Sequence, residues 1–135
     1  MRLAIVDDND GFRRFIRTTA EMEGWSAFEF EDGNQLIQHY DSAEAEVNFD
    51  LIVLDVFMRH RDAFDTMRFL AANHVQTPIV VVSGGGDMLH GDPALYLRAA
   101  GGVGKLENLN VISVLGKPVS LNDLRDILRM TVAAV

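Results

Sequence analysis

Carboxylates that directly follow apolar segments are the residues of this sequence best suited to chemistry. Asp7 and Asp8 come straight after the apolar run 3–6, and Asp55 comes straight after the run 51–54. If these three side chains lie close together, their like charges raise one another's pKa unless a cation joins them. Their position in the sequence therefore predicts an acidic cluster that needs positive charge.

Two further polar residues follow apolar runs of the same kind. Ser83 comes straight after the run 79–82, and Lys117 stands just after the run 111–115. At one edge of a sheet, the five polar residues would form a cluster of three carboxylates, one hydroxyl and one ammonium group. Mg²⁺ suits such a cluster because it binds one or two carboxylates and keeps water at its other positions.

The apolar runs have the length and composition of buried strands. The runs 3–6, 51–54, 79–82 and 111–115 are short and rich in β-branched residues, which suits strands covered on both faces. A fifth strand is predicted at 25–30, where apolar and polar residues alternate less regularly.

Helical patterns separate these strands. The spacing predicts a first helix over 10–23, with apolar residues on one side and arginines on the solvent side: Phe12, Phe15, Ile16 and Thr19 against Arg13, Arg14 and Arg17. Further apolar periods predict helices near 36–40 and 64–71, and a last helix that begins after the capping residue Ser120. Three methionines are predicted to fill the core: Met22, Met67 and Met130.

One long segment, 84–116, is rich in glycine and is expected to be mostly loop, with a helix over 93–100 inside it. The overall alternation predicts a doubly wound α/β fold, in which a five-stranded parallel sheet carries helices on both faces. The length suits one domain over residues 1–135. In such sheets ligands bind beyond the carboxyl ends of the strands, where the polar cluster is expected.

The composition argues against several classes of protein. The 12 basic and 20 acidic residues give a formal net charge of −8, which disfavours nucleic acid binding because phosphate backbones need clustered cations. The absence of cysteine excludes disulfides, thiolate metal sites and cysteine nucleophiles. No apolar run approaches the roughly 20 residues of a membrane helix. We expect a cytoplasmic protein without a membrane segment.

The residues at the strand ends resemble those of a known family. The similarity is to the receiver domains of two-component response regulators, including single-domain receivers of the chemotaxis type, and it covers essentially the whole chain. Each motif is weak alone, and the resemblance depends on all of them together: Asp7-Asp8, Asp55, Met58, Ser83 and Lys117-Pro118. It implies a flavodoxin-like sheet with strand order 2-1-3-4-5.

The resemblance also implies a function. Asp55 would accept a phosphoryl group from a histidine kinase or a phosphotransfer protein, with Mg²⁺ as cofactor. Mg²⁺ would be bound directly by Asp8, by Asp55 and by the backbone carbonyl of Phe57, and through water by Asp7. The phosphorylated protein would switch its binding to a protein partner and would not be an enzyme.

The remaining motif residues would hold the phosphoryl group. Lys117 would pair with one phosphoryl oxygen, and Ser83 would donate a hydrogen bond to another. The peptide bond between Lys117 and Pro118 would be cis, as is usual in the family.

The sequence departs from the family in four places. Phe57 is bulkier than the residues common at its position, and Arg59 follows Met58 where the family favours proline. Val114 stands where many receivers carry an aromatic switch residue, and the segment between Ser83 and Lys117 is long.

The expected switch region consists of Ser83, Gly84 and Val114. Without an aromatic residue at Val114, we expect the signal to travel by backbone displacement of the segment after Ser83. The three consecutive glycines that begin at Gly84 make this segment permissive. We expect it to be mobile before phosphorylation and ordered over 84–91 afterwards.

Two other functions remain open from the sequence. The first is a receiver-like binding module that works without phosphorylation, which the valine at position 114 and the long loop after Ser83 suggest. The second is a Mg²⁺-dependent phosphohydrolase with an aspartate nucleophile, because Asp8 and Asp10 have the spacing that such enzymes use after their first strand.

Overall fold

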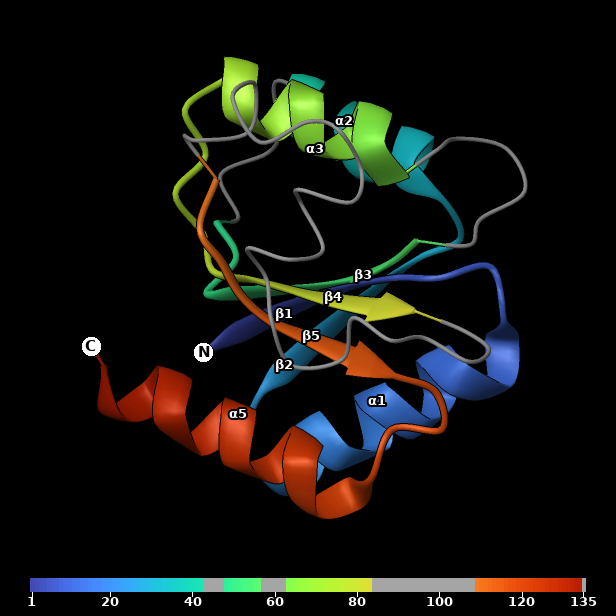
Figure 1. Ribbon diagram of the computed structural model, residues 1–135, viewed down its shortest axis with the longest axis vertical. Helices are drawn as coiled ribbons and strands as arrows, with labels where there is room; N and C mark the ends of the chain where they lie inside the picture. Colours follow the sequence, from blue (N-terminus) through green and yellow to red (C-terminus); the bar gives the residue numbers. More distant parts are fainter. Residues whose placement is uncertain (43–47, 57–62, 84–108, 135) are drawn as a thin grey trace.

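The computed structural model describes residues 1–42, 48–56, 63–83 and 109–134. In these residues a parallel sheet lies between two layers of helices (Figure 1). The elements in chain order are β1 Arg2–Val6, α1 Asp10–Met22, β2 Ser26–Phe30, α2 Gly33–Asp41, β3 Leu51–Asp55, α3 Ala63–Ala72, β4 Ile79–Ser83, β5 Val111–Gly116 and α5 Leu121–Ala133.

The sheet has five parallel strands in the order β2-β1-β3-β4-β5, which confirms the predicted fold class and strand order. The predicted strand segments are also confirmed within one residue at each end. Asp55 and Ser83 are the last residues of their strands and still pair with neighbouring strands, Asp55 with Val82 and Ser83 with Gly116. The carboxyl ends of β3, β4 and β5 therefore meet at one edge.

Strand β5 contains an irregularity that the sequence pattern does not predict. Ile79 pairs with Val111, but the next residue of β4, Val80, pairs with Ser113. Ile112 is thus an extra residue on the β5 side. An extra residue of this kind bends a strand and changes which side chains face each layer.

The two helical layers cover opposite faces of the sheet (Figure 1). Helices α1 and α5 pack together on one face, and α2 and α3 pack together on the other. Each face has its own core of buried side chains. Leu36, Leu54, Met67 and Val114 belong to the core under α2 and α3, and Ile5, Ile16, Val80 and Leu128 belong to the core under α1 and α5.

Local polar groups fix the ends of the helices. The side chain of Asn9 accepts a hydrogen bond from the Phe12 amide and caps α1. Ser120 caps α5 by accepting from the Asp123 amide at 3.0 Å, as the sequence predicts. Gly24 follows α1 with a φ of +84°, a conformation that favours glycine at the end of a helix.

Three side-chain positions differ from the sequence prediction. Met22 and Met130 are 62% and 67% exposed and are not core residues, whereas Met67 is fully buried as predicted. Arg13 was expected on the solvent side of α1, but it is buried. The buried stripe of α1 runs through Arg13, Ile16, Thr19 and Ala20, because the helix is rotated from the face that the phenylalanines suggest.

The predicted helix over 93–100 lies outside the described residues, as does most of the glycine-rich segment. Among the residues that are described, no helix has both the length and the apolar character needed to cross a membrane.

Candidate functional site

The sheet brings together the three carboxylates that the sequence singles out. β1 and β3 are neighbours, with Val6 paired to Leu54, so the residues that follow these positions lie side by side. Carboxylate oxygens of Asp7, Asp8 and Asp55 lie within 4.8 Å of one another. Asp7 and Asp55 are buried, at 1% and 2% exposure, whereas Asp8 is exposed.

Asp7 is held through both its backbone and its side chain. Its backbone N–H donates to the Phe30 carbonyl at 3.1 Å, and its backbone carbonyl accepts from Nη1 of Arg13 at 2.6 Å. Its Oδ1 accepts from the backbone N–H of Asn9 at 2.8 Å, and its Oδ2 accepts from Nζ of Lys117 at 2.9 Å. Both side-chain oxygens of this buried acid thus already have protein donors.

Lys117 reaches the carboxylates from the loop after β5. Its Nζ lies 2.9 Å from Oδ2 of Asp7 and 3.8 Å from Oδ2 of Asp55. The same nitrogen lies 4.2 Å from the centre of the Phe12 ring, within the range of a cation–π interaction. The Lys117–Pro118 peptide is cis, as the family resemblance implies. Beside Lys117, an open groove of about 570 Å³ is lined by Phe12, Phe15 and Pro118 among others.

The chemistry of this cluster fits a hard divalent cation. Carboxylate oxygens are the ligands that Mg²⁺ prefers in proteins, and the exposed Asp8 gives solvent access on one side. The single ammonium group of Lys117 cannot balance three clustered carboxylates. A bound divalent cation would supply the missing positive charge.

Other predicted site residues are described in part or not at all. The backbone of Ser83 ends β4 beside Gly116, but its side chain lies outside what the structure describes. Phe57 and Gly84 also lie outside the described residues. Val114 is fully buried in the core under α2 and α3, so it is a packing residue in this structure.

Two residues near the cluster were not predicted to take part in it. Arg13 bonds the Asp7 carbonyl, and Phe12 contacts Lys117 through its ring. The sequence feature that could have indicated burial of Arg13 is its spacing. It lies three residues before Ile16 and seven before Ala20, so it continues the buried stripe of the helix. Phe12 carried no comparable signal, because an aromatic residue in the first turn is equally suited to core packing.

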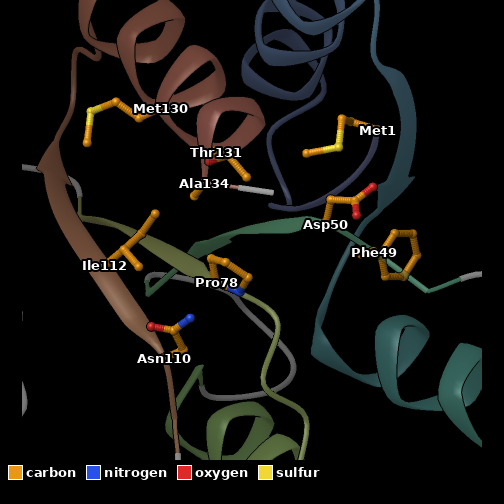
Figure 2. Close-up of a pocket in the computed structure, with 9 residues that line it drawn as sticks. All are labelled: Met1, Phe49, Asp50, Pro78, Asn110, Ile112, Met130, Thr131 and Ala134. Carbon is orange, nitrogen blue, oxygen red and sulfur yellow. The ribbon is translucent and has the colours of Figure 1, made fainter.

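A second hollow lies at the opposite edge of the sheet, where the strands begin (Figure 2). It has a volume of about 450 Å³, and Met1, Pro78 and Ile112 contribute to its mostly apolar lining. Its polar groups are already paired within the protein. For example, Asp50 accepts from the Arg2 amide at 2.7 Å, and Asn110 donates to the Gln76 carbonyl at 3.3 Å. This pocket offers apolar contact and no cluster of reactive groups.

Comparison with known proteins agrees with the geometry. The family model described as response regulator receiver domain matches residues 3–129. Among curated proteins, the chain is 30% identical over 88 residues to the transcriptional regulatory protein CpxR of Escherichia coli, which covers 65% of this chain and 35% of CpxR. It is also 30% identical over 86 residues to the transcriptional regulatory protein ResD of Bacillus subtilis, covering 64% of this chain and 34% of ResD.

The chain spans about a third of the length of these curated relatives. Among solved structures, the receiver domain of the Francisella response regulator 1452 superposes with a TM-score of 0.74 at 20% identity, covering 98% of this chain and 97% of that one. At this level of identity, the similarity bears on the fold alone.

Proposed function

This chain belongs to the response regulator receiver domain family, and we propose that it is the phosphoacceptor of a two-component phosphorelay, with Asp55 as the residue that is phosphorylated. The donor in this proposal is a phosphohistidine of a histidine kinase or of a phosphotransfer protein. The observation that carries the proposal is the position of Asp55, which lies at the end of β3, in the acidic cluster and 3.8 Å from Lys117.

The proposed reaction transfers one phosphoryl group. An oxygen of the Asp55 carboxylate forms a bond to phosphorus while the bond from phosphorus to the donor's imidazole nitrogen breaks. The electron pair of that bond returns to the imidazole, which leaves as a neutral ring because its other nitrogen carries a proton. The transition state is loose and places charge on the equatorial oxygens, so positioning and charge neutralisation matter more than a general base.

The residues of this chain supply both requirements. Lys117 is close enough to Asp55 to pair with a phosphoryl oxygen after a small movement, and Ser83, at the end of the adjacent strand, is the proposed donor to another. Mg²⁺, when bound, would neutralise charge on the phosphoryl oxygens. Such preorganised donors are worth most in a partly buried site.

We assign the metal ligands within this proposal. Asp8 and Asp55, with the backbone carbonyl of Phe57, would bind Mg²⁺ directly, and Asp7 would act through water. The contacts of Asp7 support its indirect role, because one of its oxygens accepts from the Asn9 amide and the other from Lys117.

The output in this proposal is the binding of a protein partner that recognises the phosphorylated chain. A receiver that binds partners without phosphorylation remains the second candidate, favoured by the buried valine at position 114. The phosphohydrolase alternative has less support. Its second carboxylate, Asp10, is 80% exposed and pairs with Arg13, and it is not part of the acidic cluster.

The test is phosphorylation by a small acyl phosphate in the presence of Mg²⁺, followed by measurement of the intact mass. We expect a gain of one phosphoryl group that requires Mg²⁺ and is lost in Asp55→Asn. Asp65→Asn is the matched control, since Asp65 is a partly exposed aspartate of α3 that pairs with Arg68. A gain that survives Asp55→Asn would contradict the assignment, and no gain under any condition would favour the phosphorylation-independent module.

A further inference from the structure

Arg13 is a buried cation beside the acidic cluster. Its side chain is 8% exposed, although arginine is rarely buried unless it is paired. Its Nη1 donates to the backbone carbonyl of Asp7 at 2.6 Å, its Nη2 contacts the carboxylate of Asp10, and its Nε donates to Oε1 of Glu29 at 3.2 Å. The guanidinium group therefore links the turn after β1 to α1 and to β2.

Glu29 holds this guanidinium from the neighbouring strand. Glu29 pairs with Ile5 in the sheet, so its backbone position is fixed by strand pairing. Its second oxygen, Oε2, accepts from Nη1 of Arg17 at 2.7 Å, and Arg17 also donates to Glu21 at 2.7 Å. Arg13 is thus one member of a connected charge network and is constrained from two sides.

The bond from Arg13 to the Asp7 carbonyl acts on the peptide that joins Asp7 to Asp8. Because a peptide unit is planar and contains the Cα atoms of both residues, holding its carbonyl restrains the backbone that carries both side chains. The Asn9 amide, which donates to Asp7 at 2.8 Å, closes the same turn. One guanidinium group therefore restrains the backbone that carries two of the three clustered carboxylates.

We propose that Arg13 is a positioning residue for metal binding: it holds the turn 7–9 in the conformation that presents Asp7 and Asp8 to Mg²⁺. The inference depends on the proposed function, since it assumes that the acidic cluster binds Mg²⁺. Arg13 itself does not touch the metal or the phosphoryl group.

Charge and position predict opposite effects of Arg13 on Mg²⁺ affinity. A nearby cation repels Mg²⁺, so if Arg13 acted through its charge alone, removing it would tighten binding. If Arg13 positions the carboxylates, removing it weakens binding, as changes to residues that orient metal ligands commonly do by about 10–100-fold. The sign of the change therefore distinguishes the two roles.

The experiment compares Arg13→Gln with Arg14→Gln by calorimetric titration with Mg²⁺. Arg14 is the next residue of the same helix and is exposed, and its replacement removes the same charge. We expect Mg²⁺ binding to weaken by about tenfold or more in Arg13→Gln and to stay close to that of the parent chain in Arg14→Gln. Equal affinities in the two variants, or tighter binding in Arg13→Gln, would overturn the proposal.

A second pair of variants keeps Arg13 and covers the case in which Arg13→Gln does not fold. Glu29→Gln weakens the support of Arg13, whereas Glu21→Gln removes the same charge from the far end of the network. We expect weaker Mg²⁺ binding in Glu29→Gln than in Glu21→Gln. Equal affinities in this pair count against the proposal in the same way.

A third readout needs no metal. Hydrogen exchange of the backbone amide of Asn9 in the Mg²⁺-free protein reports whether its hydrogen bond to the Asp7 carboxylate persists. We expect faster exchange in Arg13→Gln, or in Glu29→Gln, than in the matched controls. Unchanged exchange contradicts the positioning role of Arg13, whereas failure of the parent chain to bind Mg²⁺ contradicts the proposed function, so the two failures are distinguishable.

Discussion

The ammonium nitrogen of Lys117 lies 2.9 Å from Oδ2 of Asp7, a shorter ion pair than the 3.8 Å one that it makes with Asp55. The Phe12 ring lies against the same nitrogen, at 4.2 Å from ring centre to Nζ. Lys117 is therefore held beside the proposed phosphorylation site by an acid that is not itself the acceptor. A phosphoryl group on Asp55 would add an anionic oxygen within a short movement of this ammonium group.

Replacement of Lys117 by Gln is expected to slow phosphoryl transfer to Asp55. Removal of one well-placed donor from a transition state commonly costs about 100–1,000-fold in rate, and the cost here is expected at the lower end because Lys117 is partly exposed. The measurement is the rate of mass gain with a small acyl phosphate at saturating Mg²⁺. Lys105→Gln, which changes the other lysine of the chain, is the charge-matched control. Equal rates in both variants would exclude the proposed role.

Replacement of Asp8 by Asn is expected to have opposite effects on stability without and with Mg²⁺. Without Mg²⁺, it relieves repulsion among three carboxylates within 4.8 Å and raises the free energy of unfolding. With Mg²⁺ at one hundred times its dissociation constant, the parent chain gains about 2.7 kcal/mol, and the variant should lose this gain. Urea unfolding measures both. Asp126→Asn, at an exposed position of α5, should keep the full Mg²⁺ effect; if Asp8→Asn keeps it too, Asp8 is not a ligand.

Tyr40 is expected to make the protein sensitive to alkaline pH. Burial raises the pKa of its hydroxyl, and the Thr77 side chain opposes this in part. The pKa of Tyr40 in the folded protein lies above its unfolded value of about 10. The contribution of the neutral hydroxyl to the free energy of unfolding is therefore fully present below about pH 10. It is lost as pH rises through the folded pKa.

Unfolding free energies measured on both sides of this pH range test the Tyr40 prediction. Tyr40→Phe should lose less stability on alkalinisation than Tyr96→Phe, which keeps Tyr40 and removes the other tyrosine. Identical pH profiles for the two variants would show that Tyr40 does not contribute to the alkaline loss.

The sheet and the carboxylate cluster could be predicted from sequence for one physical reason. A strand buried on both faces must be apolar along its length, so the first polar residue marks its end. In a parallel sheet all such ends lie at one edge. Asp7 and Asp55 could therefore be grouped from the sequence. Lys117, 110 positions after Asp7, could be added because it follows the end of the fifth strand segment, although β5 is a partly buried edge strand that contains Ser113.

The details that decide which groups bond could not be predicted in the same way. Arg13 lies at the boundary of two possible apolar stripes on α1, and its burial depends on the rotation of the helix against the sheet. Whether Lys117 bonds Asp7 or Asp55 depends on less than 1 Å of difference in distance. Sequence periodicity specifies faces and edges, but it does not specify atomic positions.

The extra residue in β5, Ile112, also could not be predicted from the sequence pattern. Its exposed side chain provides the control for a prediction about Val114. Val114 is fully buried among the core residues under α2 and α3, whereas Ile112, two residues earlier in the same strand, is 42% exposed. Val114→Tyr adds bulk and a hydroxyl to a filled core, so it should lower the free energy of unfolding by about 1–3 kcal/mol.

Ile112→Tyr makes the same aromatic change at the exposed position, and it should stay within about 0.5 kcal/mol of the parent chain. Urea unfolding measures the difference between the two variants. If Val114→Tyr unfolds at the same urea concentration as Ile112→Tyr, the core at position 114 has room for an aromatic ring. In that case packing would not explain the valine at position 114.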